Sequence, residues 1–298
     1  MQVMSSPILA SEQIGYRRDE VHGTTLVNTP GGQVPPERIH LVPNGACVHQ
    51  ADGFIHIIAQ NGTKLHTASV SGNSSTARHG SVSPHVRRSF GSGYVAYTWW
   101  NNPSSSPIAH FTTTWTVPDS PQNIDGQLLY LFNSMEPDSF NAILQPVLQY
   151  GVSPAGGGDY WSVASWWIVG SEVYHSSLTP VTPGQSLQGV MTLITPSDGS
   201  NSYNYSSAFT GIPDSEISIS SLQELTYAWE ALEIYTASGA TDLPRGRTAM
   251  GSINLFTQDG QTPLLFWDSS DDGNDGFKVE VVADGAVNGQ VDLVYPLQ

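Results

Sequence analysis

The stretch that decides the fold class reads Ala142-Ile143-Leu144-Gln145-Pro146-Val147-Leu148-Gln149-Tyr150-Gly151. Read as a strand, it places Gln145 and Gln149 on one face with Val147 between them, because successive side chains point to opposite faces. A primary amide is both a donor and an acceptor, so it can hold a substrate carbonyl and stabilise an oxyanion. The alternative is a polar ladder on a solvated sheet face.

The sequence around this stretch has the same character. Twenty-nine glycines and twenty prolines separate short runs of aliphatic and aromatic residues, which favours strands joined by tight turns. Roughly a dozen strands are expected between Gly93 and Tyr295, too many for one flat sheet. An all-β fold of two stacked, twisted antiparallel sheets is therefore predicted. The segment from Glu224 to Tyr235 fits a short helix almost as well as a strand.

The N-terminal part forms a separate unit in this prediction. Its sequence indicates a small β-meander around three Asn-Gly and Asp-Gly turns, with strands at Arg38 to Val42, Ala46 to Gln50, Phe54 to Ala59 and Lys64 to Val70. From Ser71 to Ser92 the chain is rich in Ser, Gly, His and Arg, which is typical of a linker. We expect a basic N-terminal segment at residues 1–88 and a β-sandwich domain at residues 89–298.

Charge divides the chain in the same place. Residues 1–88 hold seven of the ten Lys and Arg side chains, five of the 26 acids and seven of the nine histidines. The total of −16 repels phosphate backbones and anionic membranes, so neither nucleic acid nor membrane is expected as a partner. Because the two parts are electrostatically complementary, we expect the N-terminal segment to pack on the acidic domain.

Several classes of site are not supported. Cys47 is the only cysteine, which excludes an intramolecular disulfide and a zinc knuckle. The acidic run from Asp268 to Asp275 lacks the spacing of a calcium loop, so neither a metal nor a cofactor is expected. No apolar run is long enough to cross a bilayer, and Met1 to Gln13 lacks the features of a signal peptide.

A second candidate feature contains two carboxylates among apolar neighbours, Tyr227-Ala228-Trp229-Glu230-Ala231-Leu232-Glu233-Ile234-Tyr235. Such surroundings can raise the pKa of a carboxyl group and make it a general base for water in acid. On a strand Glu230 and Glu233 face opposite sides, so at most one shares a face with Gln145.

Aromatic residues are dense in the domain. Most are expected in the core. Rings on one sheet face would form a groove for an extended peptide or for sugar rings, and the residues expected to bind substrate are Gln149, Trp115, Tyr160, Trp166 and Trp229.

Five motifs resemble, in order and spacing, the glutamic endopeptidases called eqolisins. They are Phe111-x-x-x-Trp115-x-Val117-Pro118, Ala142 to Gln145, Tyr160 to Trp167, Val181-x-Pro183-Gly184-x-Ser186-Leu187, and Ala228 to Tyr235. The resemblance covers about two-thirds of the chain. It implies a concanavalin A-like, eqolisin-like sandwich whose Gln/Glu dyad cleaves polypeptides in acid.

The resemblance makes Gln145 the glutamine of the dyad. An ungapped match puts Trp229 at the position of the catalytic glutamate, so Glu230 would need a one-residue bulge, and Glu233 is the other candidate. The family element Trp-Val-Gly-Ile-Asp-Gly is replaced here by Leu131 to Glu136. The resemblance also implies that residues 1–88 are an inhibitory pro-segment, and it favours an extracellular location. The alternatives are a lectin-like carbohydrate-binding module and a glycan-active enzyme with a carboxylate pair.

Overall fold

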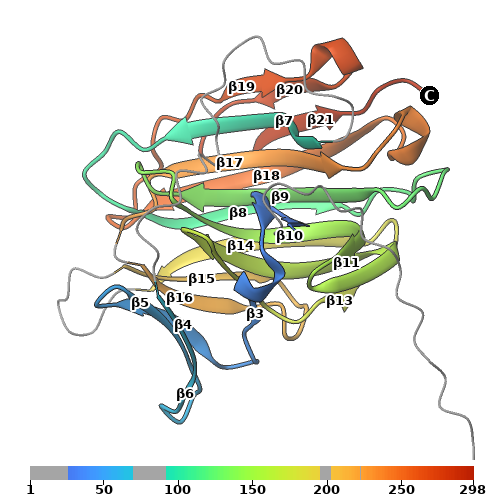
Figure 1. The fold of residues 1–298 in the computed structure, drawn as a ribbon. Helices are drawn as coiled ribbons and strands as arrows, with labels where there is room; N and C mark the ends of the chain where they lie inside the picture. Colours follow the sequence, from blue (N-terminus) through green and yellow to red (C-terminus); the bar gives the residue numbers. More distant parts are fainter. Residues whose placement is uncertain (1–25, 70–91, 195–202, 222) are drawn as a thin grey trace, which may run out of the picture.

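The computed structural model describes residues 26–69, 92–194, 203–221 and 223–298, and these form two large twisted sheets that lie face to face (Figure 1). A short hairpin covers part of the outer face of the first sheet. The predicted all-β sandwich is confirmed. Among the described residues, the helices are three 3-10 turns, Pro36–Arg38, Ala240–Asp242 and Gly273–Asp275. No helix in these ranges is long and apolar enough to span a membrane.

The first sheet has nine strands. In spatial order they are β19 (Asp268–Asp271), β7 (Ser92–Asn101), β17 (Tyr227–Tyr235), β9 (Leu128–Glu136), β10 (Ala142–Ser153), β11 (Gly156–Val169), β12 (Glu172–His175) and β3 (Ile39–Leu41), with β13 (Thr179–Pro180) pairing with β11 beside this path.

The second sheet has ten strands. In spatial order they are β20 (Lys278–Ala283), β21 (Gly289–Val294), β18 (Arg247–Thr257), β8 (Ile108–Thr116), β14 (Ser186–Ile194), β15 (Tyr203–Phe209), β16 (Ile217–Ser221), β4 (Cys47–Ala51), β5 (Phe54–Ile58) and β6 (Lys64–Ser69). The remaining two strands, β1 (Val27–Thr29) and β2 (Gly32–Val34), form the hairpin.

The N-terminal strands extend both sheets at one edge. β3 pairs in parallel with β12 of the first sheet, and β4 pairs in parallel with β16 of the second. Every other pair among the described strands is antiparallel. The prediction of antiparallel sheets is therefore wrong only for the two pairs that join the N-terminal strands β3 and β4 to the sheets. Figure 1 shows the segment in blue, crossing in front of β9 and β10 before it reaches β4, β5 and β6 at the lower left. The predicted linker lies almost entirely outside the described residues.

A charged contact fixes this edge. The buried carboxylate of Glu172 accepts from Arg38 Nη1, and its Oε2 lies 2.9 Å from His40 Nε2. Burial alone would raise the pKa of Glu172, but the hydrogen bonds and charges of His40 and Arg38 lower it below its ordinary value. The ring of His40 lies 4.1 Å, between centroids, from that of His66 on β6, so these two histidines connect the edges of the two sheets.

Apolar side chains cover both faces of the first sheet. Between the sheets Leu144 and Leu148 of β10 join a large core, and burial contributes about 1.5–3 kcal/mol for each large apolar side chain. On the outer face Ile143 and Val147 belong to a second apolar cluster. Because both faces are covered, β10 from Ala142 to Tyr150 is a run of apolar residues interrupted by its two glutamines.

The segment that fitted both a helix and a strand is the strand β17, which pairs with β9 from Tyr227 to Tyr235 without interruption. Tertiary pairing therefore decides its conformation.

Candidate functional site

The tip of the hairpin β1–β2 lies against the outer face of the first sheet. Thr29 pairs with Gly32, which leaves Pro30 and Gly31 as the two central residues of the turn. Proline suits the first central position of a type II turn, and the second requires a positive φ, which Gly31 supplies at 104°. The hydroxyl of Thr29 also donates to the carbonyl oxygen of Gly32 at 2.7 Å. The turn is therefore a preformed Pro-Gly loop.

One peptide unit of this turn is bound from both sides. Gln145 Nε2 donates to the carbonyl oxygen of Pro30 at 2.7 Å, and the N–H of Gly31 donates to Glu233 Oε2 at 2.8 Å. The Pro30 carbonyl and the Gly31 N–H belong to the same planar amide. Gln145 and Glu233 are 0% and 1% exposed. Together they hold a single peptide bond in a site closed to solvent.

Two phenols accompany this carboxylate. The hydroxyl of Tyr235 donates to Glu233 Oε1, and the hydroxyl of Tyr130 donates to the carbonyl oxygen of Asn28 at 3.3 Å. Burial raises the pKa of both tyrosines well above the ordinary value, and the charge of Glu233 raises each further. Both phenols therefore remain protonated and act as donors.

Strand register explains which residues share this face. Leu144 pairs with Met135 and Val147 with Phe132, so Gln145 lies opposite Ser134. Ser134 pairs in turn with Trp229, and the indole therefore occupies the same row as Gln145, two strands away.

A second row lies four residues further along both strands. Gln149 pairs with Tyr130, and Tyr130 pairs with Glu233. In this row a glutamine of β10 again lies two strands away from a residue of β17, but that residue is Glu233 and not Trp229. The Gln149 amide donates to the carbonyl oxygens of Gly151 and Gly156 at 2.8 and 3.0 Å. Its donors are thus bound within its own sheet, so Gln145 is the glutamine that reaches the hairpin.

Glu230 lies on the other side of the sheet, which corrects the expectation that it joins Gln145. The bulge that would have turned it does not occur, since β17 alternates regularly between Trp229 outside and Glu230 inside. Its carboxyl Oε1 accepts from the hydroxyl of Thr113 on β8, across the interior. Burial raises the pKa of Glu230 well above its ordinary value, and the Thr113 hydrogen bond offsets only part of this.

The expected substrate-binding aromatic residues divide between three places. Trp166 pairs with Gln145 and is buried on the same face. Trp115, also expected to bind substrate, lies instead on the second sheet between the two layers, where it is buried and packs against Phe209 with centroids 5.7 Å apart. Tyr160 is 45% exposed, in the first half of β11, where the register of this strand against β10 shifts.

Trp229 belongs to an aromatic group beside the hairpin. Its indole lies 5.8 Å from Trp99 and 6.0 Å from Tyr227, measured between centroids, and Phe140 lies 4.8 Å from Tyr227. Trp99, Tyr227 and Phe140 are half-buried, whereas Trp229 is buried beneath them. This group adjoins the Gln145 row and presents apolar rings.

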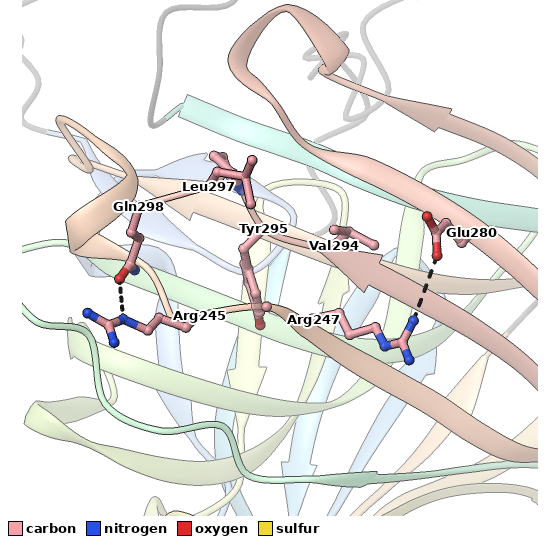
Figure 2. Close-up of a pocket in the computed structure, with 9 residues that line it drawn as sticks. Arg245, Arg247, Glu280, Val294, Tyr295, Leu297 and Gln298 are labelled. Atoms are coloured by element: carbon pink, nitrogen blue, oxygen red, sulfur yellow. Dashed lines mark hydrogen bonds and ion pairs between the residues drawn. The ribbon is translucent and has the colours of Figure 1, made fainter.

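A shallow pocket elsewhere does not compete with this site. It lies on the second sheet, and Figure 2 shows Arg245 and Arg247 on either side of Tyr295. Arg245 Nε donates to Gln298 Oε1 at 2.7 Å, and Arg247 Nη1 lies 3.0 Å from Asp292. Arg247 is therefore paired with a carboxylate, and Arg245 is hydrogen-bonded to a neutral amide. Within the described ranges, no group of three or more His, Cys, Asp or Glu side chains is placed to hold a metal.

The hairpin is the part of the site that the sequence interpretation missed. Its strands have three residues each, too short for a periodic pattern. The available signal was the sequence Thr29-Pro30-Gly31-Gly32, which matches a type II turn. Nothing local indicates that this turn contacts residues more than a hundred positions away.

Among solved structures, this chain is similar to two glutamic peptidases. Scytalidoglutamic peptidase in complex with a peptide-based transition-state analogue is 14% identical, with a TM-score of 0.46 over 68% of this chain and 98% of that chain. SCP-B, a member of the eqolisin family of peptidases in complex with the tripeptide Ala-Ile-His, is 15% identical, with a TM-score of 0.42 over 68% and 98%. No protein-family model matches the chain, and no curated protein matches it.

Proposed function

We propose that this protein is an acid-acting endopeptidase whose dyad consists of Gln145 and Glu233. The observation that supports the proposal is the peptide unit of Pro30 and Gly31, which these two side chains hold by its carbonyl oxygen and its N–H. Gln145 thereby contacts the carbonyl oxygen that becomes the oxyanion, and Glu233 contacts the amide nitrogen that is protonated when the bond breaks. The hairpin occupies the place of a substrate.

The reaction needs water and no metal. The Glu233 carboxylate takes a proton from water, whose oxygen attacks the carbonyl carbon of a substrate bound in place of the hairpin. The Gln145 N–H groups donate to the oxyanion that forms. The protonated Glu233 then gives its proton to the amide nitrogen, the C–N bond breaks, and a carboxylic acid and an amine leave. The Tyr235 hydroxyl orients the carboxylate throughout.

The hairpin resists this reaction because of how it is held. Glu233 Oε2 accepts directly from the Gly31 N–H, so this oxygen is engaged by a donor other than an attacking water. The full chain is therefore expected to be inactive while the hairpin is in place. The proposal extends the predicted pro-segment role of residues 1–88 to one defined contact.

The test compares the full chain with a variant whose hairpin tip is opened. Gly31→Val places a β-branched residue at a φ of 104°, which costs about 1–3 kcal/mol. Gly62→Val is the matched control, because Gly62 has a φ of 83° in another hairpin turn. A denatured protein substrate is incubated with each chain from pH 2 to 7. We expect cleavage only by Gly31→Val.

Added to the opened chain, Gln145→Ala should lower kcat by about 100-fold or more, as loss of an oxyanion donor does. Glu233→Gln should abolish cleavage, whereas Glu230→Gln should retain it. Cleavage that survives Glu233→Gln, or no cleavage by any opened chain at any pH, would refute the proposal.

A binding module without catalysis is the second candidate. It is favoured by Trp229, which fills the position in the Gln145 row where the resembled family has its glutamate. In that case Gly31→Val binds peptides without cleaving them, and Trp229→Glu in the opened chain gains hydrolysis. Trp229→Gln is the control, since it makes the same cavity without supplying a base.

A further inference from the structure

We infer that the outer face around Gln145 and Glu233 is a receptor for Pro-Gly β-turns, including turns presented by other polypeptides. The inference rests on the peptide-binding part of the proposed function, but not on hydrolysis. The segment bound to this face is the tip of the tight β1–β2 hairpin and not an extended strand.

The hydrogen bonds from the sheet end on backbone atoms of the turn. Gln145 reaches the carbonyl oxygen of Pro30, Glu233 accepts from the N–H of Gly31, and Tyr130 donates to the carbonyl oxygen of Asn28. Three neighbouring strands, β10, β17 and β9, supply these groups. Contacts to backbone atoms recognise the conformation of the ligand and not its side chains. The residue types of the ligand are therefore restricted only by the need to form this turn.

Proline and glycine each suit a buried turn for a different reason. Proline has no N–H, so it enters the site without a donor that needs a partner. Gly31 adopts a φ of 104°, which L-residues with a side chain rarely adopt. A Pro-Gly turn is also ordered before it binds, so little conformational entropy is lost on binding. The site therefore favours Pro-Gly over other pairs.

The hairpin competes with any added ligand, because it is part of the same chain. A short covalent connection gives an effective concentration on the order of millimolar, so an added turn should bind the wild-type chain only weakly. The opened chain Gly31→Val removes this competitor. Gly31→Asp is a second, independent way to open the tip, because it places a carboxylate beside Glu233. Hydrogen exchange of the amides at 28–34 verifies the opening.

The probe is a fluorescent cyclic peptide that carries residues 27–34, and its control is the same ring with Pro and Gly exchanged. Binding is measured by fluorescence anisotropy to the full chain, to both opened chains, and to the opened chains with Gln145→Leu or Glu233→Leu. We expect the Pro-Gly ring to bind the opened chains at least about tenfold more tightly than the exchanged ring, a difference of about 1.4 kcal/mol. Both site substitutions should remove this preference.

Three results would overturn the inference: no binding of the Pro-Gly ring to either verified opened chain, equal affinity for both rings, or tighter binding of a linear peptide with the same residues. The last result would assign an extended-strand ligand to the face. Failure of cleavage in the peptidase assay leaves these binding results unaffected, so the two proposals can fail separately.

Discussion

The hydroxyl of Thr113 on β8 donates to the carboxyl group of Glu230 on β17, and so joins the two sheets through the interior of the sandwich. Glu230 is fully buried, and its register partners Thr98 and Asn133 are buried polar residues on the adjoining strands β7 and β9. Across the interior, Gly189 pairs with Thr113 and leaves room for Asn133 Oδ1, which a Cβ would meet at 2.4 Å. The part of the interior around Glu230 is therefore a polar layer centred on a carboxyl group.

The first prediction concerns the pH dependence of stability. The folded-state pKa of Glu230 lies above its unfolded value, so its contribution to stability is fully present below the unfolded pKa and is lost as pH rises through the folded pKa. Between these two values each pH unit should cost about 1.4 kcal/mol. Glu230→Gln mimics the neutral acid and should remove this part of the alkaline loss. Thermal unfolding from pH 3 to 9 measures it, and equal pH slopes for both chains would contradict the prediction.

The second prediction tests the donor of this pair. Thr113→Val keeps the shape and β-propensity of the side chain but leaves the Glu230 oxygen without its hydroxyl donor, at a cost of about 1–3 kcal/mol. Thr114→Val is the control, because Thr114 is the next residue of β8 and is half-buried. Urea unfolding at pH 4 compares the two variants. If Thr113→Val lowers the free energy of unfolding no more than Thr114→Val does, the hydrogen bond between Thr113 and Glu230 does not stabilise the sandwich.

The third prediction separates the two glutamines of β10. Gln145→Leu removes the donor to Pro30, so the amide of Gly31 should exchange with solvent faster. Gln149→Leu changes the same residue type on the same face, but the Gln149 amide bonds to Gly151 and Gly156, so hairpin exchange should stay as in the wild type. Hydrogen exchange read by mass spectrometry distinguishes them. Equal protection of the hairpin in both variants would mean that Gln145 does not hold it.

The fourth prediction concerns the edge formed by β3 and β12. The folded-state pKa of Glu172 is lowered, so its contribution to stability is present above the unfolded pKa and is lost as pH falls through the folded pKa. Glu172→Gln should cost about 1.5–3 kcal/mol at pH 7, the value of hydrogen bonds to a charged group, and less in acid. The amide of Val42, which donates to His175, should lose protection in parallel.

The control for this fourth variant is Glu216→Gln, which changes an exposed glutamate directly before β16. A destabilisation by Glu172→Gln that is the same at pH 7 and in acid would indicate a loss of packing and not of charge.

The sequence by itself determined the all-β class, the two-layer arrangement and the face that carries Gln145. Alternation along β10 and β17 is a local property of strands, and therefore it also separated Glu230 from Glu233 correctly. The strands β3, β4, β5 and β6 were predicted close to their observed positions because the Asn-Gly and Asp-Gly turns between them are also local signals.

Tertiary structure alone decided what faces Gln145. The register of β10 against β9 and of β9 against β17 places Trp229 in one row and Glu233 in another, and register depends on pairing between segments distant in sequence. It also decided that the buried aromatic residues Trp115 and Trp166 lie on different sheets. The hairpin tip at Pro30 and Gly31 reaches Gln145 and Glu233 across 115 and 202 positions, and no local pattern encodes a contact of that span.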